Sequence, residues 1–456
     1  MEAREIKTSQ EVRQLMQEQC IEQVKIAVTD IDGVLRGKYI SRDKFLSAID
    51  SGLGFCNVVF GWDLDDQLYD AGVRYTGWHT AYPDAHVRIV PDTCRLLPSE
   101  PKTLFFLGEF CDEAGQICPR ALLGRVLERA RQAGFQVQGA FEFEFFLFDE
   151  TPDSVREKHY RGLRPITPGH FGYSILRSGV HAEFYQELLQ LGRQMDFPIE
   201  GLHTETGAGV LEAAIGVDAA LPAADKAVLF KTFTKVLAQR RGWMATFMAR
   251  WSQDWPGQSG HMHLSLQDLD GMPVFHDRSG QYGISQTMRH FIGGQQALMP
   301  ELLAMVACTV NSYSRLIPGY WAPTAATWGY ENRTTALRAI GGSPKAQRVE
   351  YRISAADINP YIAMAAAIGS GLWGIENRIE PTPSIAGSAY EAEMPAHLAL
   401  PRTLSEAAAR LRHSEAAGDL FGPSFVEHYA ATRDWEEREY RKAVTDWQLA
   451  RYFEII

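Results

Sequence analysis

One segment of the chain alternates acidic and aromatic residues. In Phe141–Phe145 the glutamates Glu142 and Glu144 stand between three phenylalanines. Residues i and i+2 of a β-strand share a face, so a strand here would present both carboxylates on one side and the phenylalanines on the other. The phenylalanine face requires a hydrophobic core. The glutamate face is therefore expected to look into a polar space.

Two further segments repeat this spacing. Two histidines and a serine share a face in Gly260–Ser265, and a glutamate lies between two arginines in Arg348–Arg352. Each pattern alone is typical of a solvated strand face or an exposed ladder of ion pairs, which contributes little to stability. Three such strands with apolar opposite faces, together with Glu205 and Glu212 around a glycine-rich turn, favour a shared site.

The chemistry of this set indicates metal ions. Carboxylates and imidazoles with no cysteine nearby in the sequence favour oxygen-preferring ions such as Mg²⁺ or Mn²⁺. So many carboxylates would not remain ionised together without cations, and two ions fit this amount of charge. The residues concerned are Glu142, Glu144, Glu205, Glu212, His261, His263 and Glu350.

A basic cluster follows in an otherwise acidic chain of net charge -11. Guanidinium groups match the geometry of carboxylates and phosphates, and metals combined with arginines indicate phosphoryl transfer. A salt-bridged structural segment is the alternative for some members. The sequence has no GxxxxGK[ST] loop, protein-kinase signature or GxSxG elbow. The cluster comprises Arg315, Arg333, Arg338, Lys345, Arg348 and Arg352.

Composition limits the remaining possibilities. With 45% hydrophobic and 22% charged residues, the 456-residue chain is typical of a globular protein. The acidic balance disfavours a nucleic-acid binder. Six dispersed cysteines without a CxxC pair, a polar Met1–Gln19 segment and no run of about 20 apolar residues predict a cytoplasmic protein.

The expected elements divide the chain into two parts and give an α+β protein. Short strands at Val24–Asp30 and Val34–Ile40 flank an Asp-Gly turn, which indicates a hairpin. Strand-rich residues 1–115 are predicted to form a small N-terminal domain, and 116–456 a larger catalytic domain. Further helices are expected at Arg120–Ala133, His181–Met195, Ala223–Arg241, Ser285–Met299, Ile358–Ile379 and Phe425–Tyr452, and further strands at Ala85–Val90, Thr103–Leu107, Gln138–Phe148, Leu211–Ile215, Met244–Met248, Gly260–Leu266, Ala336–Ala339 and Gln347–Ile353.

These segments together resemble the glutamine synthetase family along nearly the whole chain. The matching segments include FEFEFFLFD, HTETGAGVLE, GQSGHMHLSL, NSYSRLIPGY, ENRTTALR and SPKAQRVEYR, which occur in the family's order. The resemblance implies an N-terminal β-grasp domain, and a catalytic domain whose antiparallel sheet, flanked by helices, lines a metal-containing funnel. It also implies rings of subunits, usually dodecamers of two stacked hexamers, with each site completed by a neighbour.

The resemblance also implies residue roles and a reaction. ATP would phosphorylate a side-chain carboxylate, most simply the γ-carboxylate of glutamate, and an amine would displace the phosphate. Glu144, Glu205 and Glu212 would hold one metal, and Glu142, His261 and Glu350 the other. His263, Ser265, Arg338, Lys345 and Arg348 would lie near ATP, Gly257, Arg315 and Arg352 would bind the amino acid, and Arg333 would stabilise the transferred phosphoryl group.

The sequence departs from the family at the amine site. Ammonium-using members usually read Tyr-Glu-Ala-Pro after the NSYxRLxPG segment, whereas this chain has Trp321 in place of the glutamate. An aromatic wall suits a larger organic amine, through apolar burial or cation–π attraction. Asp63 is a candidate to supply a carboxylate from the neighbouring subunit. The alternatives are ordinary use of ammonium, a different carboxylate donor, and a family member without turnover.

Overall fold

The computed structural model describes residues 2–70 and 72–456. Its N-terminal part forms a six-stranded sheet in the order β2-β1-β6-β4-β3, with β5 paired to β6. Pairing is antiparallel except between β1 and β6. The elements are α1 (Ser9–Glu18), β1 (Gln23–Thr29), β2 (Leu35–Ser41), α2 (Arg42–Ala48), β3 (Leu53–Cys56), β4 (Asp84–Ile89), β5 (Arg95–Leu96) and β6 (Thr103–Phe110).

The predicted hairpin at the start of this sheet is confirmed. The Asp30 carboxylate accepts hydrogen bonds from the backbone N–H groups of Asp32 and Val34 at 3.0 and 2.8 Å, and Gly33 has a φ of +84°. Glycine adopts this left-handed conformation without steric cost. The side chain of Asn359, from the larger part of the chain, donates to the carbonyls of Asp30 and Ile31 and anchors the hairpin there.

The larger part contains a nine-stranded sheet in the order β13-β14-β15-β12-β7-β9-β8, to which β10 and β11 add at β7. All pairs are antiparallel except β13 with β14. The strands are β7 (Phe135–Phe148), β8 (Ile199–Thr204), β9 (Val210–Ile215), β10 (Asp218–Ala219), β11 (Met244–Thr246), β12 (Gly260–Asp268), β13 (Trp328–Tyr330), β14 (Leu337–Ile340) and β15 (Arg348–Tyr351).

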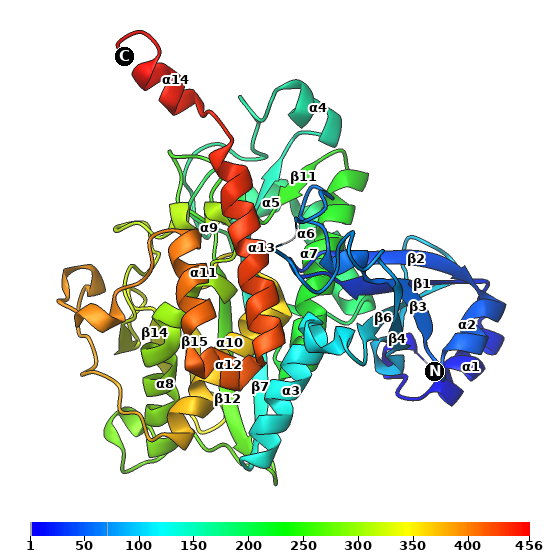
Figure 1. Ribbon diagram of the computed structural model, residues 1–456, viewed down its shortest axis with the longest axis horizontal. Helices are drawn as coiled ribbons and strands as arrows, with labels where there is room; N and C mark the ends of the chain where they lie inside the picture. The colour runs from blue at the N-terminus through cyan, green and yellow to red at the C-terminus, as the bar shows by residue number, and fades with distance from the viewer. Residues whose placement is uncertain (1, 71) are drawn as a thin grey trace.

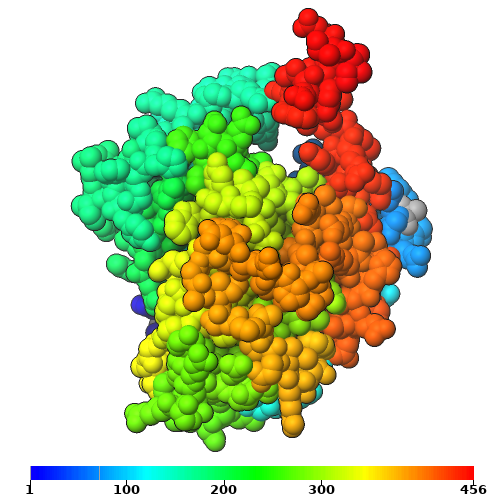
Figure 2. Space-filling view, turned by 90° about the vertical axis from the view of Figure 1, so that its left-hand side faces the viewer, coloured from blue at the N-terminus to red at the C-terminus, as the bar shows by residue number. Residues whose placement is uncertain are grey.

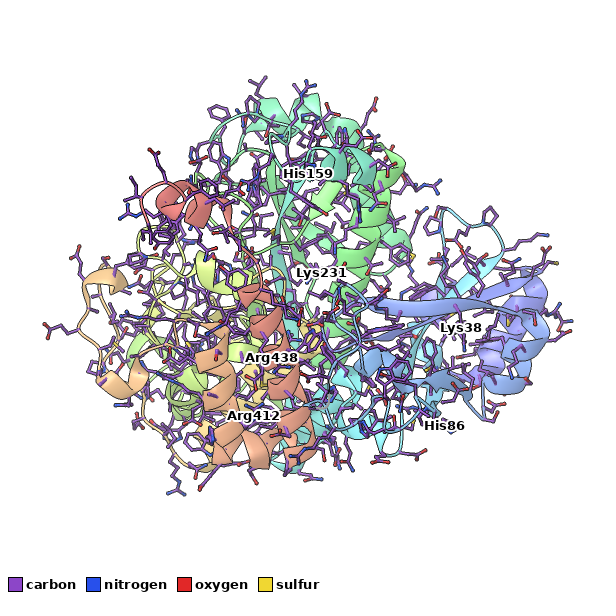
Figure 3. The ribbon with its side chains drawn as sticks, turned by 45° about the horizontal axis from the view of Figure 1, so that its top comes forward. Lys38, His86, His159, Lys231, Arg412 and Arg438 are labelled. Atoms are coloured by element: carbon purple, nitrogen blue, oxygen red, sulfur yellow. The ribbon has the colours of Figure 1, made fainter. Side chains whose placement is uncertain are left out.

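Helices cover this sheet and the surrounding body (Figure 1). They are α3 (Pro119–Gln132), α4 (Pro152–Glu157), α5 (Ile175–Val180), α6 (Ala182–Gln194), α7 (Ala220–Arg240), α8 (Gln286–Leu302), α9 (Val310–Arg315), α10 (Pro360–Glu376), α11 (Leu404–His413), α12 (Glu415–Phe421), α13 (Pro423–Arg441) and α14 (Asp446–Tyr452). In Figure 3, Lys38 lies on the N-terminal sheet, Lys231 on α7, and Arg412 and Arg438 on the helices farther from that sheet.

The phenylalanine face of β7 packs as the alternation predicts. Phe141, Phe143 and Phe145 are at most 1% exposed, and the rings of Phe143 and Phe145 contact aromatic rings of α7 and of the segment after β11. The ring of Phe143 lies 6.1 Å from that of Phe230 and 6.0 Å from that of Phe247. This core holds one side of the strand, so its glutamates must point to the other.

The prediction of a single helix over Phe425–Tyr452 is wrong. The chain leaves α13 at Arg441 and begins α14 at Asp446. Thr445 and Gln448 form a reciprocal capping box, in which each side chain accepts a hydrogen bond from the other residue's backbone N–H. Such a cap satisfies the first N–H groups of a new helix and favours a separate start. Helix α14 projects from the body (Figures 1 and 2).

Within residues 2–70 and 72–456, no helix has the length and apolar character needed to cross a lipid bilayer.

Candidate active site

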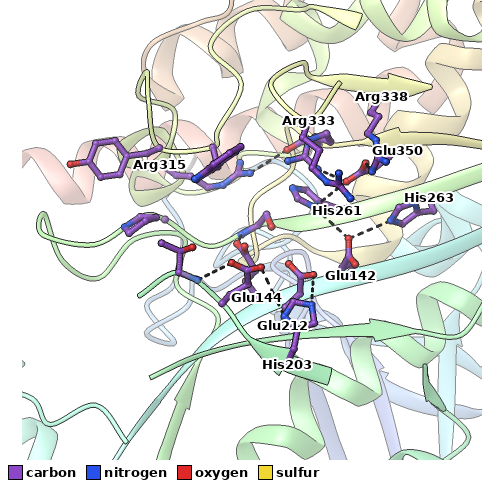
Figure 4. Close-up of a pocket in the computed structure, with 18 of the residues that line it drawn as sticks. Glu142, Glu144, His203, Glu212, His261, His263, Arg315, Arg333, Arg338 and Glu350 are labelled. Atoms are coloured by element: carbon purple, nitrogen blue, oxygen red, sulfur yellow. Dashed lines mark hydrogen bonds and ion pairs between the residues drawn. The ribbon is translucent and has the colours of Figure 1, made fainter. Parts of the chain in front are cut away.

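A cavity of about 500 Å³ opens where the glutamate face of β7 meets its neighbouring strands (Figure 4). Most of the predicted site residues line it: Glu142, Glu144, Glu205, Glu212, Gly257, His261, His263, Arg315, Trp321, Arg333, Arg338, Arg348, Glu350 and Arg352. Ser265 and Lys345 line an adjacent cavity of about 360 Å³, which shares Glu142, His263 and Arg348 with the first. The sequence-predicted set therefore converges on two joined spaces.

Asp63 is the exception. Its carboxylate accepts hydrogen bonds from the backbone N–H groups of Asp65 and Gln67, both at 2.9 Å, and from the indole N–H of Trp435 at 2.9 Å. It is only 9% exposed and is not part of either cavity. In its own chain, Asp63 thus holds a loop of the N-terminal part against α13. A role in a neighbouring subunit's site stays a prediction.

Strand register brings the acidic and imidazole groups together. His261 on β12 is paired with Glu142 on β7, and His263 with Glu350 on β15. On the other side of β7, Glu144 is paired with Glu212 on β9. Directly opposed residues of antiparallel strands have Cβ atoms about 5 Å apart, which is close enough for their side chains to share one ion.

The first cluster contains Glu144, Glu205 and Glu212. Glu144 accepts a hydrogen bond from the backbone N–H of Ser259 at 2.5 Å, and Glu205 accepts one from Thr206 at 2.8 Å. Burial, followed by repulsion from Glu142 and Glu144, raises the pKa of Glu212 to about 8. Burial also raises the pKa of Glu144. In the absence of cations Glu144 and Glu212 thus resist ionisation.

The second cluster contains Glu142, His261 and Glu350. Nδ1 of His261 lies 3.4 Å from Glu350 and 3.7 Å from Glu142. Burial and then Arg352 lower the pKa of His261 to about 4, so this imidazole is neutral and can act as a ligand. Burial alone would raise the pKa of Glu350, but Arg352 and His261 lower it to about 2.

Both clusters fit divalent cations. Their donors are carboxylate oxygens and imidazole nitrogens, the set that Mg²⁺ and Mn²⁺ accept. Two members of each cluster also lie close to a neighbouring histidine: ligand atoms of Glu142, Glu350 and His263 lie within 4.8 Å of one another, as do those of Glu205, Glu212 and His203. Nε2 of His261 is buried and has no hydrogen-bond partner among the described residues. The raised pKa values of Glu144 and Glu212 also mean that a bound cation would stabilise their ionised forms.

Arginines form the opposite wall of the cavity. Arg315 is 3% exposed and donates to the carbonyls of Ile353 at 2.9 Å and Arg352 at 3.2 Å, which fix its direction. Arg338 pairs with Glu331 at 2.5 Å and with Glu350 at 3.1 Å. Arg352 also pairs with Glu350. A wall of this kind binds carboxylate and phosphate groups.

Gly257 is required by the packing around Arg315. A Cβ atom at this position would lie 2.6 Å from Cγ of Arg315 and 2.7 Å from the carbonyl oxygen of Ala249. The glycine thus lets the backbone approach the arginine stem within the cavity.

Tyr320 and Trp321 lie at the mouth of the cavity. Trp321 is 59% exposed and has a φ of +61°, an uncommon conformation for a residue other than glycine. The ring of Tyr320 lies 5.2 Å from the guanidinium of Arg250. Arg250 donates in turn to the carbonyls of Ser252, Gln253 and Ser314. The loop at the cavity mouth thus packs against the Arg250 guanidinium, which three backbone carbonyls hold in place.

The sequence reasoning assigned no role to several lining residues, namely Tyr173, His203, Thr206, Pro256, Ser259 and Tyr320. His203 carried a usable signal, because it stands two residues before Glu205, the spacing that marked the other strands. Strand β8, which presents it, was not predicted. Burial would lower the pKa of His203, but Glu212 raises it to about 9.

Known proteins are similar to this chain in sequence and fold. Residues 116–452 match the family model described as "Glutamine synthetase, catalytic domain". The chain is 44% identical to type-1 glutamine synthetase 2 of Dictyostelium discoideum, over 95% of this chain and 84% of that protein. It is 38% identical to glutamate–isopropylamine ligase of a Pseudomonas species, over 98% of both. The solved structure of GmaS without ligand superposes with a TM-score of 0.84 at 26% identity, over 96% of this chain and 98% of that one.

Proposed function

The chain belongs to the glutamine synthetase family, and on that basis we propose that it joins glutamate to an organic amine larger than ammonium, with conversion of ATP to ADP and phosphate. The enzyme is a glutamate–amine ligase. Trp321 carries the choice of amine, because it puts an aromatic ring at the cavity mouth where ammonium-using members usually have a glutamate. The 38% identity to a glutamate–isopropylamine ligase supports the same choice.

The residues divide the reaction between them. Arg315 and Arg352, with the backbone at Gly257, hold glutamate so that its γ-carboxylate faces the γ-phosphate of ATP. That carboxylate attacks the γ-phosphorus, ADP leaves, and a γ-glutamyl phosphate forms. Arg333 stabilises the phosphoryl group during transfer, and Arg338, Lys345, Arg348, His263 and Ser265 hold the nucleotide.

The two carboxylate clusters would hold the metal ions. Glu144, Glu205 and Glu212 form one site, and Glu142, His261 and Glu350 the other. Bound Mg²⁺ or Mn²⁺ would neutralise phosphate charge and make the acyl phosphate more electrophilic.

The second step forms the amide. The amine must be neutral to attack the acyl carbon, so it loses a proton to a carboxylate at the site before phosphate leaves. Trp321 and Tyr320 would contact the apolar substituent of the amine and exclude water from the acyl phosphate.

The larger architecture follows the family. We assign residues 1–115 to a β-grasp domain and residues 116–456 to the catalytic domain. The active assembly is a cytoplasmic homo-oligomer, a dodecamer of two stacked hexamers. For Asp63 to supply a carboxylate to a neighbouring subunit's site, its contacts with Trp435 and with the loop N–H groups would have to open. Sedimentation of the purified protein tests the dodecamer directly.

An amine panel tests the proposed function. Phosphate release from ATP and glutamate is measured with ammonium, methylamine, isopropylamine, ethanolamine, a polyamine and aniline, and the products are identified by mass spectrometry. An organic amine should give the highest kcat/KM. The 44% identity to a type-1 glutamine synthetase supports the alternative, in which ammonium is preferred. A highest value for ammonium would establish that alternative.

A further inference from the structure

We propose that His203 is a nitrogen ligand of the metal ion assigned above to Glu144, Glu205 and Glu212. The inference rests on the metal sites of the proposed function and extends one of them. His203 belongs to β8, whose end leads directly into the turn that carries Glu205. Its ring nitrogens lie 3.2 Å from Glu212 and 3.9 Å from Glu205.

The hydrogen bonds of the ring select its coordinating nitrogen. Nδ1 of His203 lies 3.2 Å from the carbonyl oxygen of Thr204. A carbonyl only accepts, so Nδ1 carries the proton, and in the neutral ring Nε2 carries the lone pair. Metal-binding histidines commonly donate their other ring N–H to a backbone carbonyl in this way, which fixes both tautomer and orientation.

The free nitrogen faces a carboxylate at the distance expected for neighbouring ligands. Nε2 of His203 and Oε1 of Glu212 are 3.2 Å apart. Two lone pairs at this separation repel each other unless a positive charge lies between them. In the metal-free chain that charge is a proton. Two ligands bound at right angles, each about 2.1 Å from one ion, lie about 3 Å apart. A cation bound by both groups therefore requires little movement.

The ring is also held in place from outside the cluster. Tyr173 stacks on it, with ring centroids 4.3 Å apart and an angle of 25° between the planes. The backbone N–H of Tyr173 donates to the same Thr204 carbonyl at 2.7 Å, and the hydroxyl of Thr204 donates to the carbonyl of Phe171 at 3.1 Å. Thr204 thus fixes the imidazole and the tyrosine that covers it.

His263 provides a contrast within the same cavity. Its Nδ1 accepts a hydrogen bond from Nε of Arg348 at 3.2 Å, and a guanidinium can only donate. The lone pair of neutral His263 is therefore occupied, and its Nε2–H points toward Glu142 at 3.4 Å. His263 is a donor here, whereas His203 and His261 have a nitrogen available for a metal.

A nitrogen ligand changes which ion the first site prefers. Imidazole binds Mn²⁺ more readily than it binds Mg²⁺, for which oxygen donors are favoured. The first site should therefore distinguish the two ions more strongly than three carboxylates alone would. Loss of the imidazole should weaken Mn²⁺ binding about tenfold or more, and Mg²⁺ binding less.

Pulsed electron paramagnetic resonance of Mn²⁺ in the full-length protein tests the assignment. Wild type with both sites filled should show ¹⁴N coupling from two imidazoles. His203→Asn and His261→Asn should each leave one, and the matched control His263→Asn should leave both. Calorimetric titration with Mn²⁺ and with Mg²⁺ measures the accompanying change in ion preference for His203→Asn.

Three outcomes overturn the proposal: a single imidazole coupling in wild type, two couplings in His203→Asn, or an unchanged ratio of Mn²⁺ to Mg²⁺ affinity in His203→Asn. The wild-type spectrum decides the matter even if the variants fail to fold. All readouts are metal binding without turnover. Failure of the proposed ligase reaction would therefore appear in the amine panel and leave these results unaffected.

Discussion

The floor and the mouth of the cavity are built in different ways. The floor consists of Glu142, Glu144, Glu212, His261 and Glu350 on four paired strands, with His261 only 6% and Glu350 only 2% exposed. The mouth consists of Tyr320 and Trp321 on a loop, and Trp321 is 59% exposed. Sites on paired strands hold geometry better than loops do, and loops tolerate substitution. The floor therefore suits the reaction, and the mouth suits the choice of amine.

Replacement of a floor carboxylate should reduce activity most, and equally for every amine. Glu350→Gln removes a metal-binding charge and leaves Arg338 and Arg352 without their shared anion. We expect kcat/KM to fall roughly 10³-fold. Steady-state assays with ammonium and with the preferred amine measure both values, and the exposed Glu393→Gln serves as control. A changed ratio between the two amines would contradict the division into floor and mouth.

Removal of metal should make the stability of the floor depend on pH. In the metal-free protein, the pKa of Glu212 is raised from 4.5 to about 8 and that of His203 from 6.5 to about 9. Folding raises the proton affinity of these two groups, so the stability that they contribute is fully present below about pH 4.5 and is lost as the pH rises to about 9. The lowered pKa of His261 acts in the opposite sense, but only as the pH falls below about 6.5.

Thermal unfolding after chelation measures this effect. The unfolding temperature of the metal-free protein should be a few degrees lower at pH 8.5 than at pH 6.5, and saturating Mn²⁺ should reduce that difference. Trp321→Phe should show the same pH dependence as wild type, because the mouth contributes no titrating carboxylate. Equal unfolding temperatures at the two pH values without metal would contradict the account of the floor.

The floor also shows how far the sequence alone leads. Alternation within Phe141–Phe145 was sufficient to predict that the two glutamates share a polar face, because that choice depends only on strand geometry and burial. The pairing of His261 with Glu142 joins residues far apart in the chain. Register depends on the packing of whole faces and on turns, so local alternation does not determine it. The family resemblance supplied that grouping.

The missed features have local causes. His203 was overlooked because β8 lacks the regular alternation that marked β7: Glu200 is exposed, Thr204 is buried, and the residues between them are half-buried. The break before α14 was overlooked because the charge patterning in Phe425–Tyr452 is typical of one continuous helix. Thr445 and Gln448 form a capping box that starts a new helix instead. Which of the two signals prevails depends on the three-dimensional context. Asp63 is bound by loop N–H groups and Trp435, contacts that composition does not reveal.

A charge at the mouth should change amine preference without changing the reaction. Trp321→Glu removes an apolar wall and adds a carboxylate that favours a small cation. Loss of contact with one or two methylene groups, at about 0.8 kcal/mol each, corresponds to a shift of roughly tenfold toward ammonium. Competition assays with both amines measure the ratio, and Trp321→Phe, which keeps an aromatic wall, is the control. An unchanged ratio in Trp321→Glu would remove Trp321 from the amine site.

The smallest expected effect comes from the support beneath the mouth. Tyr320→Leu removes the ring that lies 5.2 Å from the Arg250 guanidinium, an interaction of about 0.5–1 kcal/mol. The Trp321 loop should then become less ordered, and KM for the amine should rise roughly two- to fivefold. KM for glutamate should change less, because Arg315 is fixed by the carbonyls of Arg352 and Ile353. Tyr320→Phe keeps the ring and should behave as wild type. If KM rose equally for glutamate and amine, a change at the mouth would also disturb the residues that bind glutamate. The choice of amine could then not be altered independently of the reaction.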